Sequence, residues 1–211
     1  MTIIRDIPLS LTMEHILRRQ GMVDISAVSP KILALSRELL DEVATLQYLE
    51  PAIAYEFCSV NEINDRRERL QGHAFLKTDL LQERLSSASE LAAIACTIGS
   101  RLEIKATDYF AHDEPLRGVL LDGIGSAAVD ILAQEACRMI GVEAGSRGNE
   151  SSSPLSPGMP GLPISEQRAL CRIARAEKIG VHLSESAMMM PRKSISMVVG
   201  IGPKMPTRTK T

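Results

Sequence analysis

Hydrophobic positions along this chain recur at two spacings, which predicts a fold that mixes helices with strands. After Ser29 and Pro30, a capping residue and a proline suited to a first helical position, apolar residues recur at helical spacing as far as Leu46. A longer helical pattern opens at Pro115 and ends near Gly141. We predict further helices over residues 13–21, 101–110 and 165–180, and strands over residues 2–7, 52–60, 91–98, 181–189 and 194–201.

Several stretches allow more than one interpretation. Residues 91–98 (LAAIACTI) are apolar throughout and favour a buried strand, although a helical segment is also compatible with the pattern. Residues 61–71 are charged and predict a solvated helix or a loop, and residues 79–85 predict a short helix. Inside the long helix, the small residues at 123–128 predict close approach by another backbone element, because glycine otherwise costs helix stability.

The order of these elements does not alternate strictly between strand and helix, which favours a single α+β domain over residues 1–211. Because Pro191-Arg192-Lys193 is too short for a parallel crossover, residues 184–189 and 194–201 are predicted to be neighbouring antiparallel strands. Residues 145–163 are rich in Gly, Ser and Pro and predict a flexible loop. Residues 203–211 are polar and predict a frayed tail.

Composition and charge argue against several classes of function. The net charge is −2 and the pI about 6.1, without a basic stripe, so we expect no nucleic-acid partner. Aromatic residues are only 3% and tryptophan is absent, which argues against an aromatic platform for sugars or bases. No stretch of about twenty residues lacks charge, and the N-terminal sequence lacks a secretory pattern. We therefore expect a cytoplasmic protein without a membrane span.

The residue types that bind metals or act as nucleophiles show no motif. Four cysteines lie far apart without a CxxC pair, and we expect reduced, buried thiols rather than disulfides: Cys58, Cys96, Cys137 and Cys171. The four histidines share no ligand spacing, and no Walker loop, dinucleotide fingerprint or GxSxG elbow is present. We therefore expect no zinc or iron–sulfur cluster and assign no catalytic residue.

Two segments have more unusual chemistry. In Ser156-Pro157-Gly158-Met159-Pro160, two prolines around a glycine make a stiff turn whose backbone can offer polar groups to a flat ligand, and the alternative is a connecting loop. In residues 184–196 (SESAMMMPRKSIS), Glu185 and Ser186 precede three methionines, which form a soft apolar surface. The alternative there is core packing followed by a turn.

These two segments, in this order, resemble the activation domain of cobalamin-dependent methionine synthase. That family has an Arg-x-x-x-Gly-Tyr-Pro loop, a helix, and then a Thr-Glu-Ser-x-x-Met-x-Pro-x-x-Ser-Val-Ser-Gly segment. Here the counterparts are PLSPGMP, the helix SEQRALCRIA and SESAMMMPRKSIS, with six residues in register: Glu185, Ser186, Met189, Pro191, Ser194 and Ser196. The specific resemblance covers about the last quarter of the chain, and TIGSRLE and LLDGIGSAAVD extend it to about Leu91.

The resemblance implies a curved antiparallel sheet flanked by helices, a corrinoid-binding protein or split methionine synthase as partner, and a role in its reductive reactivation. It further implies an S-adenosylmethionine site at Ser156, Pro157, Gly158, Met159, Glu185 and Ser186, with cobalamin present only through the partner. Pro154 and Met159 stand where the family has the loop arginine and tyrosine, so S-adenosylmethionine binding is expected to be weakened, unless Arg147 replaces that arginine.

Three functions follow from this resemblance and stay open at the level of sequence. The first is an accessory protein of corrinoid-dependent methyl transfer. The second is an S-adenosylmethionine-dependent corrinoid methyltransferase, and the third is an interaction module without either ligand.

Overall fold

Five strands form one curved antiparallel sheet in the computed structural model, which describes residues 1–19, 21, 28–59, 85, 87–160 and 162–205. The strand order is β1-β2-β3-β7-β4, and each neighbouring pair is antiparallel. The bounds are β1 Thr2–Arg5, β2 Ala52–Ser59, β3 Glu90–Thr97, β4 Glu150–Ser151 and β7 Ser194–Gly202. The predicted α+β class is confirmed, and the apolar run at 91–98 is a strand rather than a helix.

The helices surround this sheet in the order that the sequence predicted. Their bounds are α1 Met13–Arg19, α2 Pro30–Thr45, α5 Arg101–Ala111, α6 Pro115–Ser146 and α7 Gln167–Ile173, with 3-10 turns η2 Ile164–Glu166 and η3 Ala176–Ile179. The Ser29 side chain accepts a hydrogen bond from the Ile32 N–H, as expected of an N-cap. The predictions for residues 61–71 and 79–85 lie outside the described residues, except Leu85, which is helical.

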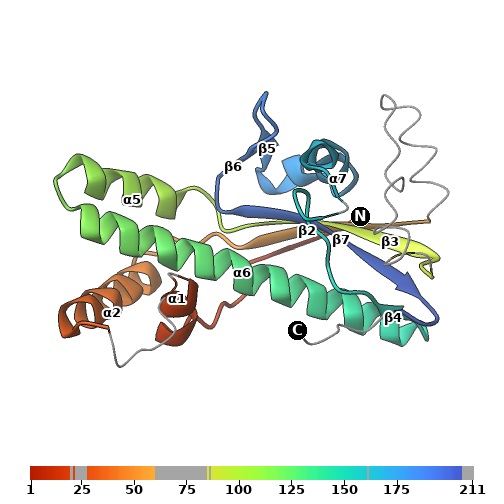
Figure 1. Ribbon diagram of the computed structural model, residues 1–211, viewed down its shortest axis with the longest axis horizontal. Helices are drawn as coiled ribbons and strands as arrows, with labels where there is room; N and C mark the ends of the chain where they lie inside the picture. The colour runs from red at the N-terminus through yellow and green to blue at the C-terminus, as the bar shows by residue number, and fades with distance from the viewer. Residues whose placement is uncertain (20, 22–27, 60–84, 86, 161, 206–211) are drawn as a thin grey trace.

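Both faces of the sheet are covered, which explains why β3 is apolar throughout. Figure 1 shows α6 with α1 and α2 along one face and α7 against the other. Alternate residues of β3 enter the two cores, with Ile94 on the α6 side and Ala93 on the α7 side. Each of these cores is lined mainly by aliphatic side chains. Among the described residues, no helix is both long and apolar enough to cross a membrane.

Within the small-residue patch of α6, Gly125 lies against side chains of α5 and of the segment before β7. A Cβ added at Gly125 would lie 2.6 Å from Cδ2 of Leu102 in α5 and 3.4 Å from Cε of Lys193. Leu102 is fully buried, so it has little room to move aside. Gly125 therefore lets α5 and the segment before β7 pack closely on α6.

The predicted pairing of residues 184–189 with residues 194–201 is wrong. A separate hairpin forms instead, in which β5 (His182–Leu183) pairs with β6 (Met189–Met190), and residues 184–188 form its turn. The turn closes because the Ser184 N–H donates to the Met188 carbonyl and Ala187 adopts a left-handed φ of 65°. β7 pairs with β3 and β4, so both of its edges are already occupied.

The predicted loop at 145–163 and the predicted tail at 203–211 are both shorter than expected. Packing against the sheet orders part of each segment, although their composition is typical of irregular backbone. In the predicted loop at 145–163, α6 continues to Ser146, β4 occupies two residues, and Leu155 bridges to Val198 in β7. In the predicted frayed tail, Met205 is 4% exposed and its N–H donates to Glu150 Oε2 at 2.9 Å. Residues 206–211 lie outside the described residues.

Candidate ligand site

The loop at residues 154–160 is held to the sheet at one point and then folds on itself. Leu155 and Val198 exchange two backbone hydrogen bonds of 2.9 and 2.8 Å. Gly158 then takes a φ of 93°, a conformation that suits glycine, and its N–H donates to the Leu162 carbonyl at 2.8 Å. The Met159 N–H donates to the Ser156 carbonyl at 3.0 Å. The stiff turn that the sequence predicted is therefore present.

Met159, which stands where the family has tyrosine, folds back over this loop. Its sulfur lies 3.3 Å from the backbone nitrogen of Ser156 and accepts that N–H. The N–H groups of Ser156, Gly158 and Met159 are thus all donated within the loop. The carbonyl groups of Pro157 and Gly158 accept no hydrogen bond from another described residue, so the polar groups this turn can offer a ligand are acceptors.

The turn of the β5–β6 hairpin carries the other predicted site residues. The Ser184 and Ser186 hydroxyls are 2.9 Å apart, and Ser184 Oγ also accepts the Met188 N–H at 3.1 Å. Glu185 is exposed, and its carboxylate pairs with no other described residue. The hairpin therefore projects a free carboxylate from a turn whose backbone is well ordered by hydrogen bonds.

Two residues at the start of α7, which sequence reasoning missed, fix that turn in place. The guanidinium of Arg168 donates to the carbonyl groups of Ser184 and Glu185. The buried amide of Gln167 donates to the Ala187 carbonyl at 2.6 Å. The sequence carried one signal for this role, a glutamine at the first position of a helix whose following residues are largely apolar.

The two predicted segments lie on the same face of the sheet. Leu155 and Leu162 of the loop belong to the core under α7, and Leu183 and Met189 of the hairpin pack against the same core. The loop leads through η2 into α7, and α7 in turn holds the hairpin turn. Within the part of the chain that is described, no hydrogen bond or ion pair joins the two segments directly. Their common support is α7.

The end of the second segment, residues 191–196, has a structural function in this chain. Ser194 Oγ donates to the Pro191 carbonyl at 2.7 Å and lies 2.9 Å from Thr97 Oγ1. Lys193 Nζ is 2.8 Å from both Asp122 Oδ2 and Ser126 Oγ of α6. These contacts tie the base of the hairpin to β3 and α6.

Arg147, the alternative to the missing loop arginine, is engaged by the central sheet instead. Its guanidinium forms an ion pair with Glu90 at 2.8 Å and lies over the Phe57 ring at 4.5 Å. Both partners belong to strands of the central sheet. A carboxylate ligand held at residues 154–160 would therefore have to find another cation.

Burial disfavours the thiolate form of three cysteines, Cys96, Cys137 and Cys171. Three of the four are buried, as predicted, and Cys137 is partly buried. Burial raises the pKa of both Cys137 and Cys171 to about 11, and burial also raises that of Cys96.

Across the described residues, no group of three or more His, Cys, Asp or Glu side chains is arranged to hold a metal ion.

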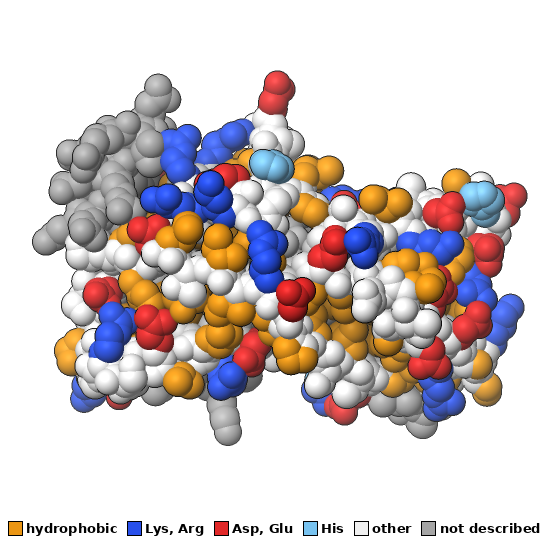
Figure 2. Space-filling model, turned by 180° about the vertical axis from the view of Figure 1, so that it is seen from behind, with side chains coloured by type: hydrophobic (Ala, Val, Ile, Leu, Met, Phe, Trp, Pro, Cys, Tyr) orange, Lys and Arg blue, Asp and Glu red, His pale blue; other side chains and the backbone are white. Residues whose placement is uncertain are grey.

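Exposed apolar side chains surround the two segments. Met188 and Met190 of the hairpin are 57% and 47% exposed, and Met159 and Ile164 are exposed beside the loop. Figure 2, which views the molecule from behind, shows apolar side chains interspersed with both acidic and basic ones over much of that face. The candidate site thus offers soft, exposed apolar contacts to a ligand or partner.

Comparison with known proteins identifies the fold. No protein-family profile and no curated protein sequence matches this chain. Among solved structures, the crystal structure of the MetH reactivation domain bound to AdoHcy is similar, with a TM-score of 0.64 and 16% sequence identity. The similarity covers 95% of this chain and 73% of that one. The fold that the resemblance in the sequence implied is therefore confirmed.

Proposed function

We propose that this protein is an accessory protein of corrinoid-dependent methyl transfer, which docks on a corrinoid-binding protein or a split methionine synthase and supports its reductive reactivation. The observation that carries the proposal is the Glu185–Ser186 turn, which matches the family motif and is presented at the surface by α7. The fold that carries this turn is similar to that of the MetH reactivation domain, over 73% of that domain's chain. In this proposal the protein acts in the cytoplasm, in methionine biosynthesis, as a single domain.

The loop fits one end of S-adenosylmethionine and not the other. The free carbonyl groups of Pro157 and Gly158 suit the amino group of an adenine, which donates two hydrogen bonds. The carboxylate end lacks a partner, because Pro154 carries no charge, Arg147 pairs with Glu90, and Arg168 is engaged by the hairpin. We therefore derive no methyl-transfer step for this chain, and the accessory role is preferred to that of an S-adenosylmethionine-dependent corrinoid methyltransferase.

The docking proposal is tested by affinity capture from the native cytosol, with the captured fraction examined for corrinoid absorbance and for cobalt. Replacing the exposed Met188 by aspartate should abolish capture, because a charge would have to be desolvated in the apolar contact. Val142 of α6 is 62% exposed, and Val142→Asp is the matched control that should keep capture.

Capture of corrinoid that is unaffected by Met188→Asp would place the contact elsewhere on the protein. Absence of corrinoid in every captured fraction would contradict the proposal and favour an interaction module without either ligand. Whether the protein binds S-adenosylmethionine is tested separately, by calorimetry on the purified protein.

A further inference from the structure

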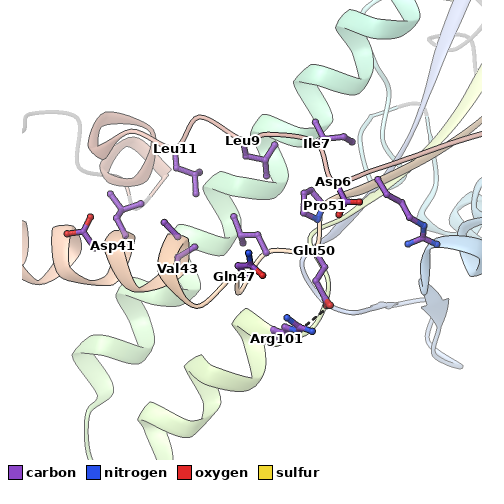
Figure 3. A pocket seen from close by; sticks show the side chains of 14 residues that line it. Asp6, Ile7, Leu9, Leu11, Asp41, Val43, Gln47, Glu50, Pro51 and Arg101 are labelled. Atoms are coloured by element: carbon purple, nitrogen blue, oxygen red, sulfur yellow. Dashed lines mark ion pairs between the residues drawn. The ribbon is translucent and has the colours of Figure 1, made fainter.

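A groove of about 830 Å³ lies on the opposite side of the sheet from the candidate site. Three segments line it, namely the chain after β1, the second half of α2, and the connection from α2 to β2, with Arg101 of α5 at one edge. The close-up in Figure 3 shows these side chains converging on one space. The volume is within the range that small-molecule sites occupy, roughly 300–1,000 Å³.

The middle of the groove is apolar. Val43 and Ile7 are buried, and Leu9, Leu11 and Leu40 are partly buried against the core on the α6 side. By contrast, the loop at 154–160 and the β5–β6 hairpin pack on the core beneath α7. The groove is therefore separate from the proposed S-adenosylmethionine site.

The charged side chains that line the groove sum to a net charge of −1, with Asp6, Asp41 and Glu50 against Arg5 and Arg101. Glu50 is neutralised by Arg101 at 3.2 Å, and the Arg5 guanidinium donates to the Lys178 carbonyl at 2.6 Å. Asp6 and Asp41 are exposed and pair with no other residue in the described ranges. In Figure 3 these two carboxylates lie toward opposite ends of the groove, with Leu9, Leu11 and Val43 between them.

The backbone adds to this negative character. α2 ends at Thr45 beside the groove without a basic residue in its last turn, so the partial negative charge of its C-terminus is not offset there. Two residues that line the groove, Asp6 and Gln47, adopt left-handed φ angles of 54° and 50°. Gln47 directly follows Leu46, the C-cap of α2, where a left-handed residue commonly ends a helix.

We propose that this groove binds a small organic cation, an ammonium group attached to an apolar body. The apolar body lies on the leucine and valine side chains, and the ammonium group pairs with Asp6 or Asp41 within reach of the α2 C-terminus. The inference does not rest on the proposed corrinoid function, and it assigns a second ligand site to the chain.

The charge preference of the groove provides the first test, made by NMR titration of the full chain with three ligands of one shape. Phenethylammonium, 2-phenylethanol and 3-phenylpropanoate share a phenylethyl body and differ in charge. Phenethylammonium should bind about ten-fold tighter than 3-phenylpropanoate, and its affinity should fall as salt is added. Methyl signals of Leu9, Leu11 and Val43 should move with binding.

The double variant Asp6→Asn/Asp41→Asn should weaken phenethylammonium binding by about five- to ten-fold, as expected for partly exposed ion pairs. The control Asp113→Asn/Glu177→Gln removes the same two charges from exposed positions outside the groove and should leave the affinity unchanged. Equal affinity for the ammonium and the carboxylate would overturn the proposal. So would the absence of binding at millimolar ligand, or signal changes confined to residues 154–160.

Discussion

The side-chain amide of Gln167 donates a 2.6 Å hydrogen bond to the backbone carbonyl of Ala187, twenty residues later in the chain. Both groups are buried, and Ala187 is held at a φ of 65°. Together with the hydrogen bonds from Arg168, this contact fixes the turn that carries Glu185 and Ser186 to the first turn of α7. No hydrogen bond or ion pair joins the loop at 154–160 directly to the hairpin turn among the described residues, so the link between these two segments runs through α7.

Replacing Gln167 by leucine should therefore loosen the hairpin turn. The Ala187 carbonyl would lose its donor in a buried setting, which typically costs about 1–3 kcal/mol. Urea unfolding should report that loss, and amide hydrogen exchange at residues 184–188 should accelerate. Ser165→Leu, two residues earlier and exposed, is the control and should leave both measurements near those of the unmodified protein.

Two tyrosines that share one carboxylate predict a pH-dependent stability. Tyr48 and Tyr109 both donate to Glu42, at 3.0 and 2.8 Å. Burial first, and then the hydrogen bond to Glu42, raises the pKa of each phenol. Because the unfolded chain then ionises first, stability is fully present below the ordinary tyrosine pKa of about 10 and falls as the pH rises above it.

The fall in unfolding free energy above pH ~10 should be steeper for the unmodified protein than for Tyr48→Phe/Tyr109→Phe. At neutral pH, Tyr109→Phe should cost about 1 kcal/mol, the usual net value of one hydrogen bond. Denaturant unfolding at a series of pH values measures both effects. A double variant that keeps the full alkaline slope would show that other groups cause it.

Two glycines of α6 should respond oppositely to alanine. At Gly125 the new Cβ would lie 2.6 Å from buried Leu102, and the forced repacking should destabilise the protein by about 1–3 kcal/mol. At Gly145 nothing lies within 4 Å, so the gain in helix propensity should stabilise it by up to about 1 kcal/mol. Thermal unfolding of the two variants provides the comparison, and equal shifts in Tm would contradict the packing described for Gly125.

The sequence predicted elements well wherever one local pattern decided the outcome. Ser29 with Pro30 located the start of α2, and the apolar run at 91–98 was correctly favoured as a strand. It did not predict pairing that depends on distant partners. β7 follows the hairpin directly, yet it pairs with β3 and β4. In that position its apolar side chains enter the cores on both faces of the sheet.

The same limit applies to the candidate site. Residues 156–159 and 185–186 could be named because a family motif marks them, whereas Arg168 and Gln167 belong to no motif. Their role depends on the turn at 184–188, which the sequence favoured as a continuous strand. Met159 likewise could be recognised as a replacement for tyrosine, but its contact with the Ser156 N–H follows only from the fold of the loop.

At the loop, Pro154 stands where the family has the arginine that would hold the amino-acid end of S-adenosylmethionine. The isolated protein should bind S-adenosylmethionine weakly, with a Kd in the high micromolar range or above, since losing a charged partner typically costs about 2–5 kcal/mol.

Pro154 is exposed, so Pro154→Arg can be made without disturbing the core. This substitution should tighten binding by roughly ten-fold or more if the guanidinium reaches the ligand carboxylate. Pro203→Arg adds the same charge at another exposed position and should leave the affinity unchanged. Calorimetry on the three proteins measures the difference. Low-micromolar binding by the unmodified chain would mean that another group holds the carboxylate, and the methyltransferase function would then be the better interpretation of this fold.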